Sequence, residues 1–141
     1  MQTNSVKSES YSGENNKLLR YTLRSNAAFS AVSGVIAILA AAPIAAFMGL
    51  ASPLILVVIG VGLLPFAFLV YKVSTMTAIK PLFVKEILVM DLLWIGGSVA
   101  ILLVGWPVLT TNGRWLVAIL ADIVAVFALL EFVGLHRLPK D

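Results

Sequence analysis

Four long runs of apolar residues, separated by short polar stretches, dominate the sequence. They cover about residues 23–42, 53–71, 84–105 and 115–135. A helix of ~20 apolar residues is long enough to cross the hydrocarbon core of a bilayer. The pattern therefore predicts an all-α fold, a bundle of four transmembrane helices within residues 18–137. Residues 1–17 are rich in Ser, Asn and Glu without apolar periodicity, which predicts a disordered cytoplasmic tail.

Composition and charge favour the same class of protein. Of the 141 residues, 60% are hydrophobic and only 12% are charged, which leaves too little polar surface for a soluble domain. Nine of the ten Lys and Arg residues fall on one predicted side of the membrane, and Arg114 falls on the other. By the positive-inside rule, this distribution predicts a multi-pass protein with both termini cytoplasmic. We expect the membrane to be a bacterial inner membrane, as the resemblance described below implies. The nine residues are Lys7, Lys17, Arg20, Arg24, Lys72, Lys80, Lys85, Arg137 and Lys140.

Small residues recur along the first predicted span. Ser30, Gly34, Ala37 and Ala41 follow one another at spacings of three and four, so they share one face of a helix. Such a face lets a second helix approach closely. We expect it to pack against another helix, and it is also the expected contact in a homodimer.

The two halves of the chain resemble each other. A shift of 65 positions aligns Asn26 with Asp91 and Phe29 with Trp94, and a slightly shorter shift aligns Tyr71 with Phe132. Two interpretations stay open, a true duplication and a chance similarity between apolar helices. A duplication predicts two helical hairpins in the same orientation, with a cleft between them as the natural place for a site.

Asp91 is the most unusual residue, because it lies about two turns inside an apolar span. A carboxylate near the middle of a bilayer costs ~2.5 to 3.5 kcal/mol and normally faces protein or water. Asp91 shares a helix face with Trp94 and Ser98, which we expect to point into the bundle. Our leading interpretation is an ion pair between Arg24 and Asp91, with Asn26 nearby, that locks the first span to the third.

Two further acids lie in the last span. Asp122 has no predicted cation at its depth, so it must be protonated, hydrogen-bonded across helices or open to water, and it is a candidate proton or cation site. Glu131 follows nine residues later, about 180° around the helix, so the two acids cannot serve one cavity. We expect Glu131 to reach toward Lys80, Lys85 or water.

The sequence carries no motif for a reaction. It contains no Cys and a single His, which gives no support for a metal site or a cofactor, and no nucleophile and base pair indicates an enzyme. The net charge of +3 reflects the orientation of the chain in the membrane and does not indicate nucleic-acid binding. The favoured function is a non-catalytic membrane subunit, accessory or scaffold protein, surrounded by membrane lipids and bound to another membrane protein or a second copy. The alternative is a small proton-coupled transporter of a cation or lipophilic solute that uses Asp91 or Asp122.

Two runs carry a family resemblance. The segments Leu23–Gly34, LRSNAAFSAVSG, and Asp91–Trp94, DLLW, resemble those of small bacterial four-helix membrane proteins without an assigned function. The resemblance covers most of residues 18–137 and implies the four-helix plan, but it transfers no active site. Small multidrug exporters are similar only in size, because the essential glutamate of their first span has no counterpart here.

Overall fold

The structure is a computed structural model that describes residues 2–105 and 108–138, with residues 2–16 described by their backbone alone. Within these residues the chain forms helices and no strand. The elements in order are α1 Gln2–Leu39, α2 Ala41–Met48, α3 Leu54–Ser74, α4 Pro81–Val104 and α5 Thr111–His136.

Four segments are long and apolar enough to cross a membrane: Lys17–Leu39 of α1, and the whole of α3, α4 and α5. The predicted all-α fold with four membrane-spanning helices is therefore confirmed, and the chain is a multi-pass membrane protein. Their bounds differ from the predicted spans by a few residues at most ends, because polar residues such as Thr111 and Asn112 extend the helices past their apolar parts.

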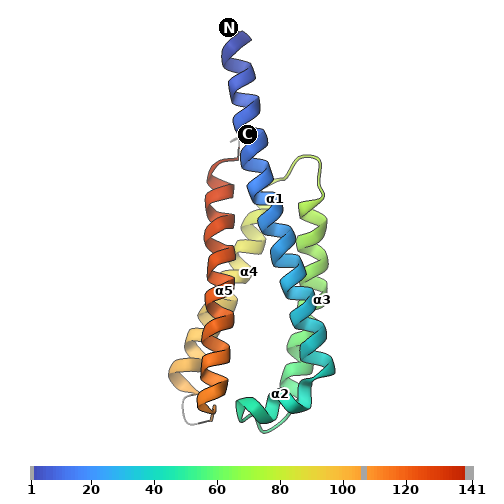
Figure 1. The fold of residues 1–141 in the computed structure, drawn as a ribbon, viewed down its shortest axis with the longest axis vertical. Coiled ribbons are helices and arrows are strands. Elements are labelled where there is room, and N and C mark those ends of the chain that lie inside the picture. The colour runs from blue at the N-terminus through green and yellow to red at the C-terminus, as the bar shows by residue number, and fades with distance from the viewer. Residues whose placement is uncertain (1, 106–107, 139–141) are drawn as a thin grey trace.

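Helix α1 also extends back to Gln2, where the sequence predicted an irregular tail. Figure 1 shows this part of α1 projecting beyond the other helices. The difference has a physical reason, because a helix already formed by the membrane span can grow by one hydrogen bond per residue without a new nucleation step.

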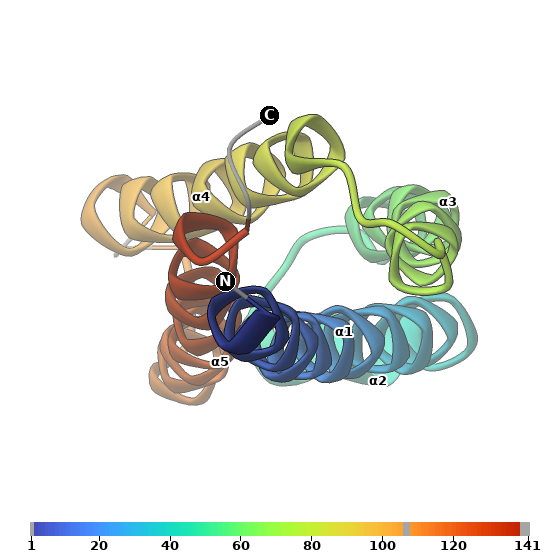
Figure 2. The ribbon, with the colours of Figure 1, turned by 90° about the horizontal axis from the view of Figure 1, so that it is seen from above.

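The four spans form two antiparallel pairs, α1 with α3 and α4 with α5 (Figure 2). The start of α1, the end of α5 and the α3–α4 connection lie at one end of the bundle, which we call the terminal end, and α2 lies at the other (Figure 1). The two hairpins thus share one orientation, as the predicted duplication requires. They meet mainly where α1 passes α5, and there a Cβ placed on Gly134 would lie 3.0 Å from Leu19 Cδ1.

The α1–α3 pair is packed closely through glycine. A Cβ placed on Gly60 would lie 2.6 Å from the carbonyl oxygen of Gly34 and 2.7 Å from Ile38 Cγ1, closer than side-chain atoms approach. Glycine at both positions lets the two backbones touch.

The small-residue face of the first span packs against other helices of the same chain. Ser30, Gly34, Ala37 and Ala41 are all buried, and Gly34 packs against α3. The expected homodimer contact through this face is therefore not available, because this chain's own helices cover it.

Helix α2 closes the end opposite the termini. The amide nitrogen of Thr110 donates to the Met48 carbonyl at 3.0 Å, and its hydroxyl donates to the Phe47 carbonyl at 2.6 Å. The same hydroxyl oxygen accepts from the Gly113 amide at 3.0 Å and caps the first turn of α5. Thr110 thus joins α2, which connects the two helices of the first hairpin, to the start of α5.

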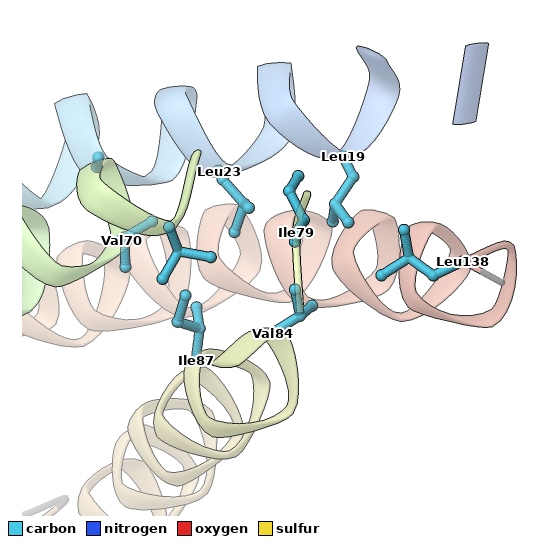
Figure 3. Close-up of a cluster of buried hydrophobic side chains, with 9 residues drawn as sticks. Leu19, Leu23, Val70, Ile79, Val84, Ile87 and Leu138 are labelled. Atoms are coloured by element: carbon cyan, nitrogen blue, oxygen red, sulfur yellow. The ribbon is translucent and has the colours of Figure 1, made fainter. Parts of the chain in front are cut away.

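The terminal end holds a cluster of buried apolar side chains, which we call the apolar cluster (Figure 3). Beside it, Arg20 of α1 donates to the carbonyl oxygens of Ser74 at 2.8 Å and Thr77 at 2.9 Å. A cation is well placed there, because the last carbonyls of a helix lack partners and carry partial negative charge. The members of the cluster are Leu19, Leu23, Ala27, Val70, Val73, Ile79, Val84, Ile87 and Leu138.

Candidate functional site

A group of polar side chains joins three helices below the apolar cluster. The amide nitrogen of Asn26 on α1 donates to Asp91 Oδ2 on α4 at 2.9 Å and to Glu131 Oε1 on α5 at 2.8 Å. Ser30, one turn further along α1, donates to Asn26 Oδ1 at 3.2 Å. We call these four residues the polar cluster. Both N–H groups of the Asn26 amide are used, one on each acid.

The polar cluster is removed from the surface of the bundle. The exposed fraction is 1% for Asn26, 3% for Asp91 and 0% for Glu131. Buried polar groups weaken a fold unless they are hydrogen-bonded. The bonds from Asn26 therefore do more than orient the acids, since they also offset part of the cost of burying them.

Apolar side chains enclose the polar cluster along the helix axes. Toward the terminal end, Leu23 and Ile87 belong to the apolar cluster, and they precede Asn26 and Asp91 by about one turn. In the other direction, the rings of Phe29 and Phe127 meet with their centroids 5.7 Å apart, again about one turn away. The acids thus lie in an apolar surrounding on both sides.

Two buried polar atoms near this level have no hydrogen-bond partner among the described residues. They are Glu131 Oε2 and Trp94 Nε1. The free oxygen of Glu131 is significant, because the other oxygen of the same carboxyl group is already bound by Asn26. The cluster therefore has acceptor capacity that its one amide donor does not fill.

The predicted ion pair between Arg24 and Asp91 is not formed. Arg24 is exposed, and Asp91 accepts from Asn26 instead. Helical geometry explains the error, since residues two apart point about 200° away from each other on a helix. Once Asn26 faces Asp91, Arg24 has to face outward. Asp91 and Ser98 are buried as predicted, and Trp94 is half-buried.

The expectation for Glu131 is also wrong. The sequence placed this acid near the membrane surface, reaching toward Lys80 or Lys85, yet it is fully buried and bound to Asn26. The signal that could have identified it is the internal repeat. The alignment of Tyr71 with Phe132 also pairs Val70 with Glu131, and both side chains are 0% exposed.

Asp122 lies apart from the polar cluster. It is exposed on the outer side of α5, opposite the buried Glu131, as the spacing of nine residues predicts. Large apolar side chains surround it along the helix. Trp115, Ile119, Val126 and Leu129 have exposed fractions of 66%, 51%, 56% and 62%. We call these four residues and Asp122 the outer stripe of α5.

The chemistry of the polar cluster is that of two carboxylic acids, one amide and one hydroxyl. Within residues 17–105 and 108–138, no three His, Cys, Asp or Glu side chains gather as metal ligands would. The arrangement is suited to binding protons and to linking α1 with α4 and α5.

Comparison of the chain with protein-family models, with curated proteins and with solved structures gave no match.

Proposed function

We propose that this protein is a non-catalytic membrane subunit or scaffold that binds another membrane protein through the outer stripe of α5. The observation that carries the proposal is the exposure of Asp122 on a membrane-spanning helix. The outer stripe has the spacing of a helix contact, because its residues 115, 119, 122, 126 and 129 alternate steps of four and three. This is the heptad pattern of two helices packed side by side.

The depth of Asp122 makes contact with lipid unfavourable. It lies eleven residues after Thr111, or ~16 Å along a helix that is itself long enough to cross the bilayer. Ionisable residues at that depth are costly and almost always face protein or a water-filled cavity. Since no part of the described chain covers Asp122, a second protein is the natural cover.

The chemistry of Asp122 favours a partner that supplies a cation or another hydrogen-bond donor. In a symmetric pair of α5 helices, Asp122 would meet a second Asp122, and neither carboxylate could donate a hydrogen bond unless one of them retained a proton. A partner helix with a Lys, Arg, Asn or Gln at mid-depth would instead complete an interhelical hydrogen bond. We therefore assign the outer stripe to a different membrane protein.

The proposed setting is a bacterial inner membrane with both termini in the cytoplasm. The charge distribution supports it, because Lys72 lies in the last turn of α3 and Lys85 near the start of α4, whereas Arg114 lies in the first turn of α5. The α3–α4 connection lies at the terminal end (Figure 1). Lys140, which belongs to the same count, lies outside the described residues. A cytoplasmic terminal end follows from the positive-inside rule.

The test uses the fact that the chain contains no cysteine. Single-cysteine variants Ile119→Cys and Val126→Cys are labelled with a photoreactive maleimide and irradiated in native membranes. Val35→Cys on the exposed face of α1 is the matched control. Each variant is prepared with Asp122 intact and with Asp122→Leu, and the adducts are separated by mass.

We expect a protein adduct of one defined mass from both α5 positions, and its loss in Asp122→Leu. An adduct of twice the chain's mass would replace the proposed partner with a second copy. Lipid adducts alone from the α5 positions, or protein adducts as frequent from Val35→Cys, would refute the proposal.

The polar cluster favours a second function, proton-coupled transport of a cation or lipophilic solute. It offers two carboxyl groups inside the membrane-spanning part of the chain, which is a common feature of proton relays. Proton uptake by liposomes that contain the purified protein, measured with a solute gradient, tests this function directly. Uptake that disappears in Asp91→Asn would favour transport over the scaffold role.

A further inference from the structure

We propose that Asp91 and Glu131 form a proton-binding site that retains at least one proton at neutral pH. The two carboxyl groups converge on one amide nitrogen, at 2.9 and 2.8 Å. An ionised carboxylate only accepts hydrogen bonds. Two carboxylates held this close repel each other, whereas one retained proton removes one of the charges and supplies a donor. The site does not depend on the proposed partner of α5.

Among the side chains that the structure describes, no cation contacts the pair. Helix α1 presents Asn26 and Ser30 to it, and α3 contributes the apolar side chain of Val70 at the neighbouring cluster. The charged side chains nearest along the helices are exposed. They are Arg24 on α1, Lys85 and Glu86 on α4, and the titratable His136 on α5. Without a cation beside it, a buried pair of carboxyl groups keeps protons because the ionised form is poorly solvated.

The free oxygen of Glu131 marks an open acceptor position. Glu131 Oε2 is buried and has no partner among the described residues, while Oε1 is held by Asn26. A proton on Oε2 leaves the bond from Asn26 to Oε1 in place. Glu131 can therefore hold a proton without losing its contact with α1.

The orientation of Asn26 favours a proton over a metal cation. Its NH₂ group faces both acids, and its oxygen accepts from Ser30. A metal cation between the acids would attract the amide oxygen and repel the NH₂ group. The amide would then turn around and lose both bonds to the carboxyl groups.

Proton exchange at this site is tied to helix packing. The apolar cluster seals the terminal side, and the Phe29–Phe127 contact seals the other. Exchange of a proton at the acids therefore requires local movement of the side chains or helices around them. Removal of the last proton leaves two charges that push these helices apart, so proton occupancy and the α1 contact influence each other.

Infrared spectroscopy of the purified protein in lipid tests the site. A protonated carboxylic acid has a carbonyl band that is separate from the carboxylate band and shifts in D₂O. The spectra are recorded at neutral pH in the Asp122→Asn background, because Asp122 is the remaining acid at mid-membrane depth. In this background Glu131→Gln and Asp91→Asn are compared with Glu86→Gln, which replaces an exposed acid of α4.

We expect the protonated band in the background protein and in Glu86→Gln, and its loss when Glu131→Gln and Asp91→Asn are combined in one protein. A background protein without the band, or a band that survives in the combined variant, would overturn the proposal. Loss of the band when sodium replaces choline at constant pH would also overturn it and assign the cluster to a small metal cation.

A second measurement covers the case in which a cluster variant fails to fold. Unfolding of the wild-type protein in detergent is followed as pH rises above neutral. If the folded site holds a proton that the unfolded chain releases, stability falls with rising pH. We expect Glu131→Gln, or Asp91→Asn if only that variant folds, to reduce this fall. A wild-type stability that does not decline above neutral pH would contradict the site.

Discussion

Helix α1 makes two contacts of different kinds. Against α3, Gly34 and Gly60 bring the two backbones together inside one hairpin. Against α4 and α5, Asn26 donates to Asp91 and Glu131 and joins the first hairpin to the second. The glycine contact uses backbone and apolar atoms, whereas the polar cluster holds two acids and a free buried oxygen.

The two contacts are expected to respond differently to a change of pH. The glycine contact contains no titratable group, so it has one state at every pH. The polar cluster can hold different numbers of protons, and each number changes the attraction between the hairpins. The two contacts of α1 are therefore expected to differ in how their stability depends on pH.

The largest expected effect comes from Asn26→Leu. This change removes the only amide donor to Asp91 and Glu131 and leaves both acids buried. An unsatisfied buried acceptor costs roughly 1–3 kcal/mol, so we expect the free energy of unfolding in detergent to fall by about 3 kcal/mol. Ser25→Leu is the control, because it adds the same side chain on the exposed side of α1. An equal loss of unfolding free energy in the two variants would show that the bonds from Asn26 do not stabilise the fold.

Gly60→Ala tests the other contact of α1. The new methyl group would lie 2.6 Å from the Gly34 carbonyl oxygen, so α1 and α3 have to move apart. We expect a loss of about 2 kcal/mol, typical of overpacking. In Gly62→Ala the methyl group meets no atom within 4 Å, so a change below about 0.5 kcal/mol is expected. The contrast is measured by unfolding both variants in detergent.

Glu131→Gln should have a small effect, because glutamine has the shape of a protonated glutamate. If Glu131 holds the shared proton, the free energy of unfolding at neutral pH changes by less than about 0.5 kcal/mol. If Glu131 is instead ionised, the substitution removes a charge-assisted bond to Asn26, and a loss of about 2 kcal/mol follows. Asp91→Asn, measured in the same way, shows which acid carries the proton.

The helices and the inward face of Asp91 could be predicted from sequence, because both depend on local patterns. Apolar length determines which segments span a membrane, and the steps from Asp91 to Trp94 and Ser98 determine a helix face. The repeat added a non-local signal, since its shift of 65 residues pairs Asn26 with Asp91, the two residues that are hydrogen-bonded in the structure.

The partners of the acids could not be read from the same patterns. Charge complementarity favoured Arg24 as the partner of Asp91. Residues two apart point to opposite sides of a helix, so Arg24 cannot face α4 when Asn26 does. Distance from the end of the span favoured a surface position for Glu131, but burial depends on where α1 and α5 cross. That crossing is a tertiary contact, in which Leu19 packs on Gly134 one turn from Glu131.

Asp122→Leu should have the smallest effect on the chain itself. Asp122 is exposed, in contrast to the buried Asp91, so the same change from Asp to Leu separates the two environments. We expect the free energy of unfolding in detergent to change by less than about 0.5 kcal/mol in Asp122→Leu, because surface substitutions rarely exceed that value. Asp91→Leu should lose about 2 kcal/mol, because Asn26 then keeps a buried N–H group without an acceptor. Comparable losses would show that Asp122 supports the fold of the isolated chain, and the outer stripe would then no longer require a partner.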